Sequence, residues 1–122
     1  MMSKRIPILV AEDEAMLRII VVEMLEEAGF AVYEAGDGIE ALALLKAHPQ
    51  IALLVSDIKM PCMDGFALVA AGLEFKPELK VLLMTGYAPG PLPPALKARQ
   101  IPILHKPFNP ERLCAMAVAL VA

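Results

Sequence analysis

Short apolar runs alternate with longer segments of mixed polarity along this chain. Five of the runs have the length and composition of buried strands, and they lie at residues 6–11, 30–35, 51–56, 79–84 and 101–104. The third run, IALLVS, is apolar throughout, which is typical of a central parallel strand whose two faces are both covered. Helix-like or helix-length segments separate the runs. Strands that alternate with helices in this way predict βαβ units, a parallel sheet and helices on both of its faces.

Helices are predicted where apolar residues recur every three to four positions instead of forming a continuous run. Residues 15–29 follow the helical period and end on Gly29 as a stop signal. A second helix is predicted over residues 37–49, with Asp37 as its N-cap and Pro49 just beyond its end. A third is predicted over residues 65–77, capped by Asp64, and a last one from about residue 110 to 120.

The segment between the last two predicted strands does not follow this pattern. Four prolines, at positions 89, 91, 93 and 94, crowd the first half of residues 87–100, where a fourth helix would otherwise stand. One proline suits the start of a helix, but several in succession do not. We predict an extended loop followed by about one and a half helical turns near residues 95–99. The final helix is apolar on several faces, which suggests a partner surface as well as core.

Composition restricts the kind of protein this can be. The 122 residues suffice for one domain with a core of its own, and that core must be aliphatic because 58% of residues are apolar and only 5% aromatic. No apolar run reaches the roughly 18 residues that a membrane span needs, and acids directly after the first run are not typical of a signal peptide. The net charge of −3 and the lack of a basic cluster argue against nucleic-acid binding. We expect a small cytoplasmic domain with no nucleic-acid or membrane partner.

Polar residues gather where the predicted strands end. They are Glu12, Asp13 and Glu14 after the first strand, Asp57 after the third, Thr85 and Gly86 after the fourth, and Lys106 and Pro107 after the fifth. In an open α/β sheet, functional groups lie outside the carboxyl ends of the strands. Taken alone, Asp57 is more typical of a helix cap than of a functional site. The other groups that would share its edge favour the functional interpretation.

Carboxylates at one edge need a cation. Two carboxylates about 5 Å apart repel by roughly 3 kcal/mol at an effective dielectric constant near 20. A hard divalent ion with oxygen ligands, Mg²⁺ in the cell, would hold them together, and Lys106 would add a fixed positive charge. The Thr85 hydroxyl can contact a phosphoryl oxygen. A carboxylate beside a metal can also act as a nucleophile that accepts a phosphoryl group, which gives an aspartyl phosphate.

Four motifs together resemble the receiver domain of two-component response regulators. LVAEDE is similar to the family's acidic pair after the first strand, and SDIKMPCMDG to its phosphoacceptor motif. LLMTGYA is similar to the Thr followed by a small residue, and HKPF to the Lys-Pro-Phe end of the fifth strand. The resemblance covers essentially the whole chain. It implies a flavodoxin-like receiver fold, a doubly wound five-stranded parallel sheet of order 2-1-3-4-5, here with a shortened or irregular fourth helix.

The resemblance also implies a role for each motif residue. Asp57 would be the phosphoacceptor. Asp13 and Asp57 would be side-chain ligands of Mg²⁺, with the backbone carbonyl of Lys59 as a third ligand and Glu12 acting through water.

The phosphoryl group would have its own set of contacts. Thr85 and Lys106 would bind its oxygens, and Gly86 would leave it room. The resemblance implies a cis peptide bond before Pro107.

Some positions depart from the family pattern or vary within it. Ile103 stands where receivers usually carry an aromatic residue that swings inward as the threonine engages the phosphoryl group, so the usual switch is in doubt. Tyr87 could take over part of that role or simply lie on the surface. Lys59 and Tyr87 occupy two variable positions that tune the lifetime of the phosphoryl group in the family. The Pro-rich residues 88–94 alter a face on which receivers dimerise or meet outputs, as a mobile loop or a shorter rigid connection.

We expect a single receiver domain over residues 1–122 with no output domain, which signals through protein–protein contacts. A histidine kinase or phosphotransfer protein would donate the phosphoryl group to Asp57. The chain would not be an enzyme beyond its own phosphorylation and dephosphorylation. The output partner is unknown, and a homodimer is left open.

Other interpretations carry different expectations. The chain could be a receiver excised from a hybrid histidine kinase, or a pseudo-receiver that binds partners without phosphorylation. An aspartate-nucleophile phosphohydrolase would need D-x-D-x-T after the first strand and a cap domain. A flavodoxin-like electron carrier would need a Ser/Thr/Gly-rich phosphate loop there, where this chain has three acids.

Overall fold

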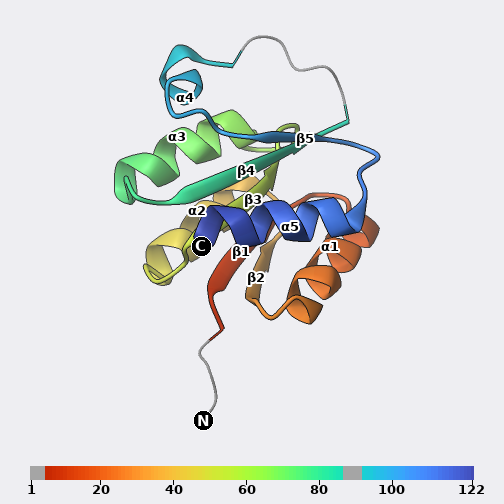
Figure 1. Ribbon diagram of the computed structural model, residues 1–122. Coiled ribbons are helices and arrows are strands. Elements are labelled where there is room, and N and C mark those ends of the chain that lie inside the picture. Colours follow the sequence, from red (N-terminus) through yellow and green to blue (C-terminus); the bar gives the residue numbers. More distant parts are fainter. Residues whose placement is uncertain (1–4, 87–91) are drawn as a thin grey trace.

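Five parallel strands form the centre of the protein in the computed structural model, which describes residues 5–86 and 92–122 (Figure 1). Strands and helices alternate along the chain as β1 (Pro7–Ala11), α1 (Ala15–Glu27), β2 (Ala31–Ala35), α2 (Gly38–Ala47), β3 (Leu53–Asp57), α3 (Gly65–Phe75), β4 (Lys80–Thr85), α4 (Pro94–Lys97), β5 (Ile103–His105) and α5 (Pro110–Val121). The strand order is β2-β1-β3-β4-β5, so the predicted fold class is confirmed. Strand and helix ends differ from the predicted ones by at most two residues.

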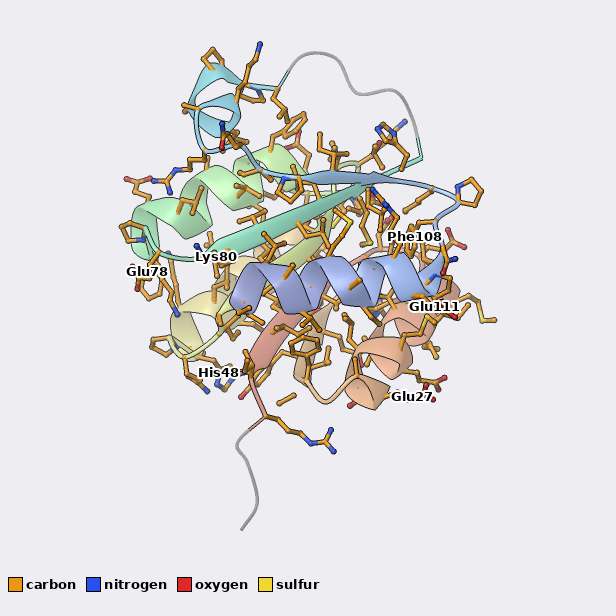
Figure 2. All side chains as sticks on the ribbon, in the orientation of Figure 1. Glu27, His48, Glu78, Lys80, Phe108 and Glu111 are labelled. Carbon is orange, nitrogen blue, oxygen red and sulfur yellow. The ribbon has the colours of Figure 1, made fainter. Side chains whose placement is uncertain are left out.

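Two aliphatic cores cover the two faces of the sheet. Alternate residues of β1 and β3 separate cleanly between them, because successive side chains of a strand point to opposite faces. Leu9 and Leu54 lie with side chains of α2 and α3, whereas Ile8 and Leu53 lie with side chains of α1 and α5. Charged side chains such as Glu27, Glu78 and Glu111 lie at the periphery (Figure 2).

Helix starts follow the signals in the sequence. The carboxylate of Asp37 accepts a hydrogen bond from the Glu40 N–H at 2.8 Å, which caps α2. Asp64 caps α3 in the same way by accepting from the Ala67 N–H at 2.8 Å. Both predicted caps are confirmed.

The fourth helix is short, as the prolines predict. It is a single turn, Pro94–Lys97, with proline at its first position. The first five residues of the segment 87–100 lie outside the described residues. The following strand starts late, at Ile103, because Pro102 has no N–H to donate; its carbonyl still accepts from the Leu83 N–H at 3.0 Å. Within the described residues, no helix has the length and apolar character to cross a bilayer.

The loop between β3 and α3 folds back over the last residue of β3. The Gly65 N–H donates to the Ile58 carbonyl at 2.7 Å. A Cβ on Gly65 would lie 2.3 Å from the carbonyl oxygen of Asp57 and 2.8 Å from the Cα of Ile58. These are backbone atoms with little freedom to move, so only glycine fits, and the loop stays close to Asp57.

Gly65→Ala is expected to lower the free energy of unfolding by about 2–3 kcal/mol, because the added methyl group overpacks a rigid backbone contact. Gly86→Ala is the matched control, since its Cβ would meet nothing closer than the Cδ of Lys106 at 3.9 Å. We expect it to change the free energy of unfolding by about 0.5 kcal/mol or less. Urea unfolding followed by circular dichroism measures both variants, and equal losses would contradict this account of the loop.

Candidate functional site

Four strands deliver polar side chains to one edge of the sheet. Glu12 directly follows β1, Asp57 and Thr85 are the last residues of β3 and β4, and Lys106 follows β5. Because all strands are parallel and these four are adjacent, their carboxyl ends meet at this edge. Glu12, Asp57 and Thr85 are 0%, 7% and 3% exposed. Such burial of the two carboxylates is rare unless they are paired. The predicted gathering of these residues at one edge is what the structure shows.

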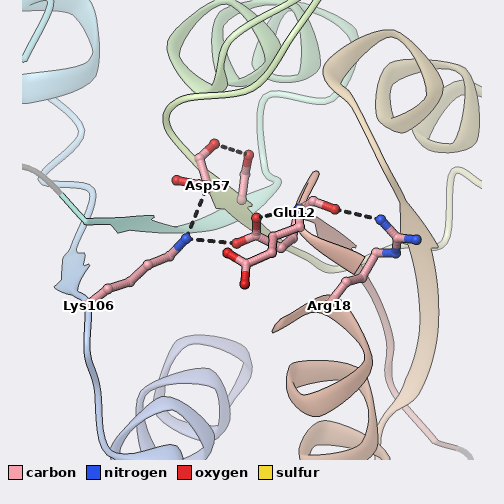
Figure 3. Close-up of polar contacts among 6 residues, drawn as sticks. Glu12, Arg18, Asp57 and Lys106 are labelled. Carbon is pink, nitrogen blue, oxygen red and sulfur yellow. Dashed lines mark hydrogen bonds and ion pairs between the residues drawn. The ribbon is translucent and has the colours of Figure 1, made fainter. Parts of the chain in front are cut away.

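Lys106 joins the two buried carboxylates (Figure 3). Its Nζ lies 2.9 Å from Oε1 of Glu12 and 2.9 Å from Oδ2 of Asp57. Burial acts to lower the pKa of Lys106, but hydrogen bonds and charge attraction from both carboxylates outweigh it and raise that pKa. Burial raises the pKa of Glu12, while the hydrogen bond from Lys106 opposes the increase. The ammonium therefore stays charged and offsets the repulsion between the two acids.

Glu12 is held by both its backbone and its side chain. Its N–H donates to the Ala35 carbonyl at 3.1 Å, which ties the end of β1 to β2. Its second carboxylate oxygen accepts from the Glu14 N–H at 3.0 Å. The neighbouring Asp13 is exposed by contrast. The acidic pair thus has one fixed, buried member and one member that faces solvent.

The acids fit a hard divalent cation. One carboxylate oxygen each from Glu12, Asp13 and Asp57 lies within 4.8 Å of the other two. Such a set of oxygen donors is what Mg²⁺ prefers in proteins. The acids line a cleft of about 650 Å³, together with Glu14, Lys59, Gly86 and Lys106. The cleft leaves room for a small anionic group beside the acids.

The remaining predicted residues lie around this cleft or away from it. Thr85 is buried next to the cleft but is not among the residues that line it. The Lys106–Pro107 peptide bond is cis. Ile103 is half-buried against the core under α2 and α3 and is not among the residues that line the cleft. Tyr87 lies outside the described residues.

One contact was not anticipated from the sequence. Arg18, in the first half of α1, donates from a guanidinium nitrogen to the backbone carbonyl of Glu12 at 2.8 Å. The only feature of the sequence that indicates this contact is a basic residue one turn into the helix after the acidic loop. A solvent-exposed arginine on that helix would have the same sequence.

Comparisons with known proteins agree with this geometry. A family model of the response regulator receiver domain matches residues 8–118. The response regulator receiver protein CpdR of Brucella abortus is 40% identical over 103 residues, which cover 84% of this chain and 85% of that protein. The transcriptional regulatory protein DctD of Rhizobium meliloti is 37% identical over 95% of this chain, but the chain spans only 25% of its length.

A solved structure shares the fold over nearly the whole chain. The chemotaxis protein CheY4 of Vibrio cholerae superimposes with a TM-score of 0.82 at 29% identity, covering 96% of this chain and 99% of that structure. Receiver domains of this kind are signalling modules of two-component systems. With nearly its full length matched by the family and by these relatives, the chain belongs to the response regulator receiver domain family.

Proposed function

We propose that this chain accepts a phosphoryl group onto Asp57 from the phosphohistidine of a histidine kinase or a phosphotransfer protein. One observation carries the proposal. Asp57 ends the central strand in a cleft where Lys106 contacts its carboxylate at 2.9 Å and two further acids lie close by. Membership of the receiver family supports the same role.

The transfer needs a nucleophile, a counter-charge and space. A carboxylate oxygen of Asp57 attacks phosphorus, the bond from phosphorus to the donor's imidazole nitrogen breaks, and its electron pair stays on the imidazole. Lys106 can then pair with a phosphoryl oxygen instead of with the Asp57 carboxylate alone. The Thr85 hydroxyl is proposed as a second contact, and Gly86 as the residue that leaves room. Attack by water on phosphorus later breaks the bond from phosphorus to the Asp57 oxygen, which releases inorganic phosphate and restores the carboxylate.

The acids would hold Mg²⁺ through side-chain oxygens of Asp13 and Asp57, the backbone carbonyl of Lys59, and a water on Glu12. When bound, the ion would neutralise charge on the phosphoryl oxygens. Lys59 lines the cleft, which supports a role for it in setting the lifetime of the phosphoryl group. The same role for Tyr87 stays a prediction. Ile103, which does not line the cleft, is proposed to change how phosphorylation is signalled.

The outer face of α1 is the surface proposed to meet the phosphoryl donor. Met16, Ile19 and Ile20 are 69%, 49% and 48% exposed. They share one side of the helix, at spacings of three and four residues. The helix begins two residues after Asp13, directly after the acidic loop that lines the cleft. A donor helix that buries it would bring its phosphohistidine to Asp57.

Incubation of the wild-type protein with acetyl phosphate and Mg²⁺ is expected to add one phosphoryl group, seen by intact mass spectrometry. Asp57→Asn removes the nucleophile, so that variant and a sample in EDTA should gain none. A wild-type protein that stays unmodified and also fails to bind beryllofluoride would favour the pseudo-receiver interpretation.

Lys106→Met is expected to slow phosphorylation by acetyl phosphate at least about tenfold at saturating Mg²⁺, because the phosphoryl oxygens lose a charged partner. The apparent affinity for Mg²⁺ should stay equal or increase, since the acids lose their internal cation. Lys46→Met, at an exposed position in the last turn of α2, is the charge-matched control. A Lys106→Met protein with the wild-type rate at saturating Mg²⁺ would count against the proposed contact.

Met16→Lys should slow transfer from a histidine kinase that phosphorylates the wild-type protein, by about tenfold, because a charge enters an apolar interface. Phe75→Lys is the control, at an exposed apolar residue in the last turn of α3. Both variants should accept from acetyl phosphate at the wild-type rate, since a small donor needs no docking surface. If Met16→Lys accepts from the kinase as fast as Phe75→Lys does, α1 is not the docking surface.

A further inference from the structure

Arg18 ties three elements together behind the acidic cleft. It lies in α1, and its Nε lies 3.1 Å from Oε1 of Glu34 on β2. A second guanidinium nitrogen donates to the backbone carbonyl of Glu12, just after β1, at 2.8 Å (Figure 3). The Arg18 side chain is 22% exposed, so most of it is packed rather than free in solvent.

The contact with the Glu12 carbonyl bears directly on Asp13. A peptide group is planar, so holding the carbonyl of Glu12 also fixes the direction of the N–H and the Cα of Asp13. In the part of the chain that the structure describes, no hydrogen bond or ion pair orients the exposed Asp13 side chain itself. Its carboxylate therefore depends on the backbone to stay near those of Glu12 and Asp57.

We propose that Arg18 is a positioning residue for the cation site: its guanidinium holds the Glu12–Asp13 peptide so that three carboxylates converge. The inference rests on the proposed function, in which these acids bind Mg²⁺. Arginine suits the task because its rigid fork can hold two acceptors at once. Gly36, just after β2, leaves the space for it, since a Cβ there would lie 3.3 Å from the guanidinium.

Positioning and simple charge effects predict opposite changes in affinity. A positive charge near a cation site weakens Mg²⁺ binding, so removing Arg18 would strengthen binding if only charge mattered. The pairing with Glu34 at 3.1 Å already offsets part of that charge. If Arg18 acts by holding the peptide, its removal weakens binding instead, as the loss of outer-shell partners does at metal sites.

Isothermal titration of the purified protein with Mg²⁺ tests the inference. Arg18→Met is expected to weaken Mg²⁺ binding by about tenfold or more. Arg18→Lys keeps the charge but lacks the fork, and it should bind about as weakly as Arg18→Met. Arg112→Met removes a charge from an exposed position of α5 and should stay within about twofold of wild type.

Gly36→Ala gives a milder test that leaves every charge in place. Its added methyl group pushes on the guanidinium, so Mg²⁺ binding should weaken by about two- to fivefold. This variant keeps the inference testable if the Arg18 variants do not fold, which urea unfolding in EDTA would reveal. Amide hydrogen exchange at Glu14, whose N–H donates to the Glu12 carboxylate at 3.0 Å, should be faster in the variants without metal because the acidic loop is no longer held.

Unchanged or tighter Mg²⁺ binding in Arg18→Met would overturn the inference, as would wild-type affinity in both Arg18→Lys and Gly36→Ala. The proposed function has a separate readout, the labelling of the wild-type protein by acetyl phosphate. If the wild type binds Mg²⁺ but takes up no phosphoryl group while the Arg18 variants bind Mg²⁺ weakly, the positioning role stands and the phosphoacceptor role fails.

Discussion

The ammonium of Lys106 contacts a carboxylate oxygen of Glu12 and one of Asp57, both at 2.9 Å. Two carboxylates with so little exposure would repel each other and pay a large desolvation cost without a cation between them. This bridge is therefore the condition on which the arrangement of the cleft depends. It connects the ends of β1, β3 and β5, which are distant in sequence. The same cation is available to any anion that reaches Asp57.

The rest of the fold supplies the rigidity that the bridge requires. Adjacent parallel strands bring the charged residues to one edge, and two aliphatic cores fix the strands from both faces. Gly65 lets the loop after β3 lie against the backbone of Asp57. Arg18 donates to the Glu12 carbonyl and pairs with Glu34, which connects the acidic loop to α1 and β2. The site is thus a solvent-facing cleft, and the charged residues that line it lie at the edge of a tightly packed sheet.

Much of this arrangement could be predicted because the functional residues directly follow the apolar runs that form the strands. Asp57 and Lys106 each follow a recognisable apolar run, and the parallel topology alone brings them to one edge. Side-chain contacts between elements were not predictable in the same way. Whether Arg18 reaches a carbonyl or points into solvent depends on its rotamer and on Glu34 of a neighbouring strand. Pro102 shows how one residue can move a strand end, since its missing N–H leaves Ile103 as the first residue of β5.

The most direct test of the account is to locate the phosphoryl group. Borohydride reduces an aspartyl phosphate to homoserine, so the protein would be treated with acetyl phosphate and Mg²⁺, reduced, digested and sequenced by mass spectrometry. If Asp57 is the phosphoacceptor, homoserine is expected at position 57 and nowhere else. Reduction at Asp13, or a wild-type protein that carries no homoserine, would contradict it.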